Sequence, residues 1–397
     1  MTQSYSIYIH IPFCQHRCSY CDFNTYAGIE SLIPDYIQAL CREIRFISLA
    51  AEDRLPVHTV FFGGGTPSLL PLTALEEIFY SLKQSFLLHS EAEVTLEANP
   101  GTLTLSYLQG LHSLGINRLS LGMQSANSGD LRLLERQHDL SGVVQSVRWA
   151  RQAGYKNLNL DLIFGIPYQS LESWNRTLRM ALSLLPEHLS LYALTLEHGT
   201  PLEHWVSRGL VLAPDDDLAA DMYDFAAETL EKAGYIQYEI SNWARRDSQG
   251  KVLSCLHNLQ YWRSLPYLGL GAGAHGYAHR TRTANVLSPP AYIHRLQAEQ
   301  AASDMPFPST PAAVEVVLID RQRAIGEYMM MGLRLVHEGV SEVDFRERFG
   351  KSLDFEFKSV IKSLEKKGLL EWNHEKQILR LTPRGRLLGN QVFCEFI

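Results

Sequence analysis

The sequence lacks the features that direct a chain into or across a membrane. None of its apolar runs reaches the length of a membrane span, although 46% of the 397 residues are hydrophobic. The first residues, MTQSYSIYIH, lack the basic and then apolar regions of a signal peptide. These absences predict a cytoplasmic protein.

The sequence also lacks an excess of basic residues, internal repeats and low-complexity tracts. Its formal net charge is −7, whereas a nucleic-acid-binding surface needs clustered Lys and Arg. We therefore expect no nucleic-acid partner.

Cysteine is scarce, with six residues in the whole chain, which excludes a disulfide scaffold. Cys41, Cys255 and Cys394 are scattered, and we expect them to behave mostly as small buried hydrophobes. The other three form a C-x3-C-x2-C cluster in HIPFCQHRCSYCDF, residues 10–23.

This cluster has no fourth cysteine, and Phe23 occupies the position two residues after the third. Three thiolates can bind an iron–sulfur cube and leave one iron without a protein ligand. The alternatives are a zinc site completed by His10 or His16, and cysteines that bind nothing.

The length of the chain favours a barrel-like unit with a smaller appended domain. Apolar, β-rich runs alternate with helical patterns in the first half and predict six βα units, hence an α/β fold with a partial (βα)6 barrel. The six expected strands cover 5–11, 57–62, 92–98, 117–123, 158–164 and 188–194.

We divide the chain into a barrel (1–240), a connecting region (241–310) and a C-terminal domain (311–397). The last segment reads as helix, helix and β-wing, the order of a winged helix in an α+β domain. It contains fourteen Lys/Arg and thirteen Asp/Glu, which favours packing or partner binding over DNA binding.

The hexapeptide HNLQYW (257–262) combines a potential iron ligand with flat aromatic surface. A neutral imidazole at His257 could bind heme iron, and Tyr261 and Trp262 could contact a porphyrin. The same residues also suit a core loop in which His257 is hydrogen-bonded. The nearby His275, in GAGAHGY, is given no ligand role.

The motifs, taken together, resemble a known superfamily. The cysteine cluster after YIHIPF, with GGGTPS at the next strand, resembles radical S-adenosylmethionine (SAM) proteins. The resemblance implies a [4Fe–4S] cluster on Cys14, Cys18 and Cys21, with SAM on the open iron.

The order of the further motifs EANPGTL, SLGMQSAN, LERQH and DLIFGIP narrows the resemblance to one branch. That branch contains the oxygen-independent coproporphyrinogen III oxidases and the HemW-type heme chaperones. By this resemblance Tyr8, Gly64 and Glu97 contact the cluster-bound SAM. A second SAM site or adjoining pocket is implied for Tyr20, Gly65, Thr66, Gln124, Arg136 and Asp161.

Two features favour the chaperones within this branch. The oxidases continue to a fourth cysteine where this chain has Phe23, and HNLQYW matches the chaperones' HNxxYW signature. The implied heme residues are His257, Asn258, Tyr261 and Trp262.

The resemblance implies a chaperone that carries heme as cargo to respiratory acceptor proteins at the membrane, and allows for a homodimer. The alternatives are a coproporphyrinogen III oxidase and another radical SAM enzyme, so enzymatic activity is left open.

Overall fold

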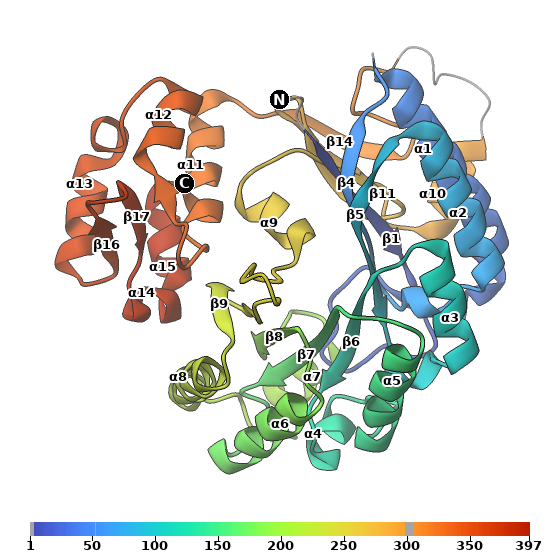
Figure 1. The fold of residues 1–397 in the computed structure, drawn as a ribbon, viewed down its shortest axis with the longest axis horizontal. Coiled ribbons are helices and arrows are strands. Elements are labelled where there is room, and N and C mark those ends of the chain that lie inside the picture. Colours follow the sequence, from blue (N-terminus) through green and yellow to red (C-terminus); the bar gives the residue numbers. More distant parts are fainter. Residues whose placement is uncertain (1–3, 52, 298–304) are drawn as a thin grey trace.

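The computed structural model describes residues 4–51, 53–297 and 305–397, and its centre is one large mixed sheet. The order of its strands is β14-β13-β12-β11-β1-β4-β5-β6-β7-β8-β10-β9. Its central parallel strands are β1 Tyr5–Ile11, β4 Pro56–Gly64, β5 Leu87–Ala98, β6 Arg118–Gln124, β7 Leu158–Phe164 and β8 His188–Ala193. All six predicted strands are present, and the sheet curves without closing, which confirms a partial barrel (Figure 1).

Helices cover the outer face of this sheet (Figure 1). They are α1 Ile33–Ala50, α2 Leu72–Ser85, α3 Leu105–Leu114, α4 Ser128–Leu133, α5 Leu140–Gln152 and α6 Leu171–Ser183. Local sequence sets several of their starts: Asp139 and Ser170, for example, accept hydrogen bonds from the first turns of α5 and α6.

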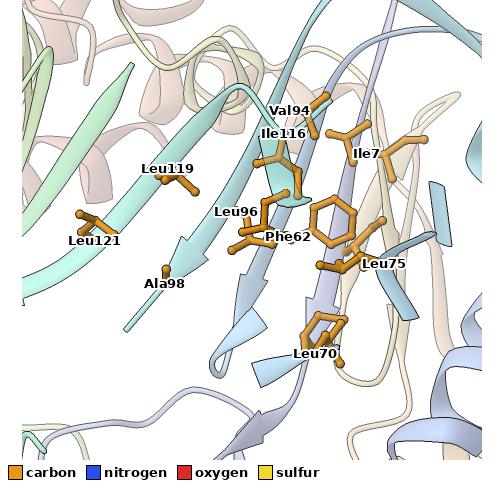
Figure 2. Close-up of a cluster of buried hydrophobic side chains, with 14 of the residues drawn as sticks. Ile7, Phe62, Leu70, Leu75, Val94, Leu96, Ala98, Ile116, Leu119 and Leu121 are labelled. Carbon is orange, nitrogen blue, oxygen red and sulfur yellow. The ribbon is translucent and has the colours of Figure 1, made fainter. Parts of the chain in front are cut away.

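Strand alternation gives the two faces of the sheet different chemistry. The odd-numbered residues of β1 and their neighbours on β4–β6 are apolar and share one core with residues of the helices. Figure 2 shows Ile7, Phe62, Leu96 and Leu119 in a cluster of these buried side chains. The inner face carries polar side chains instead, among them Thr59, Glu93, Glu97, Ser120 and Asp161. A polar inner face can bind ligands because the outer face supplies the core.

Segments after β8 extend the sheet at both ends. They are β9 Ile236–Glu239, β10 Asn242–Ala244, β11 Tyr267–Leu270, β12 His275–Ala278, β13 Thr281–Asn285 and β14 Ala313–Leu318, with helices α7 Pro201–Ser207, α8 Asp216–Lys232, α9 Leu256–Trp262 and α10 Pro289–Gln297. Short strands β2 Phe13–Cys14 and β3 Tyr26–Ala27 flank the cysteine loop. Because β10–β13 come from 241–310 and pair within the barrel sheet, our division at 240 and 310 remains a proposal.

The C-terminal part has its own core and the predicted winged-helix order. Its elements are α11 Arg321–Gly332, β15 Val340–Ser341, α12 Glu342–Phe349, α13 Leu353–Lys366, β16 Leu370–Asn373, β17 Ile378–Leu381, α14 Pro383–Leu387 and α15 Gly389–Phe393. Helix α9 contacts both β4 and α11, and Figure 1 shows it between the sheet and this domain. None of the described helices is long and apolar enough to cross a membrane.

Candidate functional site

Cys14 ends β2, Cys18 and Cys21 lie in the loop between β2 and β3, and none of the three forms a disulfide. Cys14 is buried, Cys18 and Cys21 are half-buried, and burial raises the pKa of the Cys14 and Cys21 thiols. Among the described residues, no group of three or more His, Cys, Asp or Glu is arranged to hold a metal ion. The donor set, three free thiols on one loop, nevertheless suits an iron–sulfur cube.

Arg136 supplies positive charge beside these thiols. Its Nη1 donates to Sγ of Cys18 at 3.4 Å, and its Nη2 donates to the carbonyl of Gly122 at 3.2 Å. The Nε atom of Arg136 is buried and has no partner among the described groups. A guanidinium here would favour thiolates, so the charge fits a cluster bound by sulfur.

The glycine-rich turn after β4 holds the start of the cysteine loop. The N–H groups of Gly65 and Thr66 donate to the carbonyls of Ile11 and Phe13, both at 2.8 Å, and Oγ1 of Thr66 donates to Sγ of Cys14 at 3.5 Å. A Cβ on Gly65 would lie 2.6 Å from the carbonyl oxygen of Phe13. Glycine is thus required here by the close approach of the chain itself.

Gly64 joins this turn to the inner face of the barrel. It has a φ of +108°, and its N–H donates to Oε2 of Glu97 at 3.1 Å. Burial, reinforced by the carboxylate of Asp161, raises the pKa of Glu97 to about 8. Asp161 itself accepts from Ser120 and Asn159 at 2.9 and 2.8 Å, and burial raises its pKa. Two acids on the inner face, one on β5 and one on β7, therefore resist ionisation.

The remaining residues expected at this end lie on different elements. Gln124 ends β6 with a φ of +61°, a conformation that non-glycine residues adopt mainly at constrained positions. Tyr20 packs with Leu134, Ile163 and Ile166, and burial raises its pKa. The hydroxyl of Tyr8 donates to Nδ1 of His10 at 3.0 Å, because Nε2 of the same ring donates to the carbonyl of Asn24.

A cavity of about 630 Å³ connects this end of the barrel with the C-terminal domain. Such a volume falls within the ~300–1,000 Å³ typical of ligand sites. Its wall includes Tyr8, Gly64 and Glu97 from the barrel, Phe23 from the cysteine loop, Tyr261 and Trp262 from α9, His275 and Tyr277 from β12, and Glu327 and Arg348 from the C-terminal domain. Aromatic rings thus line a space that the predicted SAM residues also reach.

His257, in contrast, lies in the core and does not line this cavity. It is 1% exposed, stacks on Phe61 with 5.0 Å between ring centroids, and burial lowers its pKa to about 3. Its Nδ1 lies 2.8 Å from Oγ1 of Thr59, and its Nε2 lies 2.8 Å from the hydroxyl of Tyr261.

These contacts define the tautomer of His257. The hydroxyl of Thr59 donates to Ser6 at 2.6 Å, so its oxygen must accept from the Nδ1–H of His257. Nε2 is then the acceptor for the hydroxyl of Tyr261. His257 therefore positions Tyr261 at the cavity wall, while Asn258 is half-buried on the same helix.

Glu93 holds α9 against the barrel, and it was not identified from the sequence as a site residue. Its carboxylate accepts from the N–H groups of Leu256 and His257, both at 3.1 Å, which satisfies the free amides of the helix start. Spacing in EVTLEA offered a signal, because residues 93 and 97 share one face of a strand. Arg118, buried on the same inner face, was also missed.

Residues 8–181 match the radical SAM superfamily, and residues 319–388 match the HemN C-terminal domain. The chain is 37% identical over 393 residues to the heme chaperone HemW of Bacillus subtilis (strain 168), with 99% of each chain covered. It belongs to the HemW family of the radical SAM superfamily.

A second HemW, from Mycobacterium tuberculosis (strain H37Rv), is 36% identical over 393 residues that cover 98% of this chain and 94% of the relative. The structure of coproporphyrinogen III oxidase (HemN) from Escherichia coli superposes with a TM-score of 0.82 and 23% identity, over 100% of this chain and 90% of that one. This likeness shows the fold, including the C-terminal domain. Membership of the superfamily implies a [4Fe–4S] cluster and SAM.

Proposed function

We propose that this HemW family member binds heme in the cavity between the barrel sheet and the C-terminal domain, and transfers it to respiratory acceptor proteins at the membrane. The observation that carries the proposal is the shared wall: Tyr261 and Trp262 of HNLQYW line the same cavity as Tyr8, Gly64 and Glu97. The names of the relatives, heme chaperone HemW, support the cargo.

The cavity has the chemistry that a porphyrin needs. Aromatic faces can stack on the macrocycle, and Arg348 can pair with a propionate. Among the ion pairs of the described residues, Arg348 has no carboxylate partner, and its guanidinium donates to the carbonyls of Arg263 and Ser264 at 3.5 and 2.7 Å. Arg282, in contrast, is paired with Glu327 at 2.9 Å. One wall comes from α11 and α12, so the C-terminal domain can contribute to holding and releasing the cargo.

We further propose that Cys14, Cys18 and Cys21 hold the [4Fe–4S] cluster at the neighbouring end of the barrel. Bound there, the cluster and SAM would supply one-electron chemistry or serve assembly of the chaperone. Tyr8, Gly64 and Glu97 would contact the SAM on the cluster, since Gly64 and Glu97 are already joined by a hydrogen bond. The other polar residues of this end, including Gln124, would line the adjoining pocket.

The test combines heme binding and oxidase activity in one sample. The chain is reconstituted anaerobically with iron and sulfide, titrated with heme, and then supplied with coproporphyrinogen III, SAM and reductant. We expect heme binding without conversion of the porphyrinogen. Protoporphyrinogen as a product would establish the oxidase instead.

A paired variant tests the SAM assignment. Glu97→Ala should weaken the effect of SAM on the EPR signal of the reduced cluster while iron content stays at the wild-type level. Equal loss of iron would assign Glu97 a structural role.

A further inference from the structure

The glycine-rich segment before β12 presents a histidine to the cavity. His275 is exposed, begins β12 and lines the cavity together with Tyr277. Alternation along the strand places these two side chains on one face, while Gly276 and Ala278 are buried on the other. The regular geometry of β12 therefore directs the side chain of His275 towards the cavity.

Close backbone packing fixes this position. A Cβ on Gly269 would lie 1.9 Å from the carbonyl oxygen of His275, so β12 lies directly against β11. Gly271, with a φ of +99°, would place a Cβ 2.5 Å from the carbonyl oxygen of His10. The N–H of Asn285 donates to the carbonyl of Ala274 at 2.9 Å. These contacts account for Gly269 and Gly271 of GLGAGAHGY and hold the turn before His275 in place.

An axial ligand of heme iron needs a free lone pair in reach of the porphyrin. Both nitrogens of His257 are engaged with Thr59 and Tyr261 inside the core. His275 lines the cavity, and its wall also provides Tyr261 and Trp262 as aromatic surface.

We propose that the imidazole of His275 is the axial ligand of the heme iron, an inference that rests on the heme binding proposed above. A ring nitrogen of the neutral imidazole donates its lone pair to the ferric iron and displaces a water. No proton or electron is transferred in this step. His257 is then a positioning residue that holds Tyr261 at the wall.

The experiment compares His275→Ala with His294→Ala, a matched change at an exposed histidine of α10 that does not line the cavity. The reconstituted full chain is titrated with ferric heme and followed by its Soret band and EPR spectrum. His275→Ala should lose the spectrum of a nitrogen-ligated iron and bind heme about tenfold or more weakly. Added imidazole should restore the wild-type spectrum in this variant, and His294→Ala should behave as wild type.

Iron-free protoporphyrin IX separates the two proposals. If wild type and His275→Ala bind it equally, as measured by quenching of tryptophan fluorescence, the cavity holds a porphyrin and only the iron ligand is at issue. An unchanged ferric spectrum and affinity in His275→Ala would then overturn the assignment of His275. The assignment would also be overturned if Tyr261→Phe lost the wild-type ferric spectrum while His275→Ala kept it. That result would assign the iron ligand to the phenolate of Tyr261. Failure of wild type to bind either porphyrin would refute the proposed function itself.

Discussion

His257→Ala should destabilise the fold while leaving the ligand spectrum of bound heme unchanged. The imidazole fills a buried site and makes two 2.8 Å hydrogen bonds, to Thr59 and Tyr261. Its loss leaves the hydroxyl of Tyr261 without its acceptor, at a cost of ~1–3 kcal/mol. Losing the stacked ring on Phe61 adds about 2 kcal/mol from the cavity left behind. The sum is about 3–5 kcal/mol.

The loss should also depend on pH. Burial lowers the pKa of His257 to about 3 in the folded chain, against 6.5 for the free side chain. The unfolded chain therefore binds the proton first as pH falls below 6.5, and wild type loses about 2 kcal/mol between pH 7 and pH 5 from this group. His257→Ala lacks this term, so its deficit relative to wild type should shrink on acidification.

Urea unfolding of the full chain, followed by circular dichroism at pH 7 and pH 5, measures both effects. His294→Ala is the control, since an exposed substitution should stay within about 0.5 kcal/mol of wild type. Heme bound to the folded fraction of His257→Ala reports the ligand. A variant as stable as wild type but with an altered heme spectrum would refute this reasoning and return the ligand role to His257.

Three further predictions concern the cysteine loop and the barrel end. Replacing all three loop cysteines by alanine should abolish the brown colour and the absorbance near 400 nm of the reconstituted chain, whereas Cys394→Ala should retain both; dependence on Cys394 would refute the three-thiolate cluster. Glu97→Gln should flatten the pH dependence of stability: the carboxyl of Glu97 keeps its proton up to about pH 8, whereas the unfolded chain loses it near 4.5. As pH rises between these two values, the free energy of unfolding of wild type should fall by up to ~1.4 kcal/mol per pH unit relative to the variant. Melting temperatures that change in parallel with pH in both proteins would contradict the shifted pKa. Phe23→Ala should change stability by less than about 0.5 kcal/mol, because the ring is 63% exposed, yet speed heme release in stopped-flow transfer to apomyoglobin; an unchanged rate would exclude contact with heme.

The sequence carried enough information for the parallel barrel because each element is long and strongly periodic. The run 158–164, for example, forms β7 over the predicted residues. The C-terminal order of elements was predictable for the same reason. Glu97 and Asp161 lie on two of these strands, where alternation turns both side chains to the inner face.

Short elements and long-range docking were not predictable in this way. Strands β10–β13 have three to five residues, too few for alternation to stand out from a loop, and their pairing joins residues far apart in sequence. The side of α9 that faces the core depends on Glu93, more than 160 residues away along the chain. HNLQYW alone therefore allowed both a buried and a ligand-facing His257. The side of α9 that faces the core distinguishes these two alternatives.

Asn24 joins the cysteine loop to the glycine-rich segment before β12, residues 269–274. Its side chain donates to the carbonyls of Ala272 and Leu287 at 3.1 and 2.9 Å, and its own carbonyl accepts from His10 at 2.9 Å. A Cβ on Gly273 would lie 2.4 Å from its amide nitrogen. Whatever fixes one of these segments therefore stabilises the other, and thermodynamic linkage makes the effect reciprocal. A bound cluster would then strengthen heme binding without contacting the heme. The heme-loaded chain would lose the iron of its cluster more slowly than the heme-free chain.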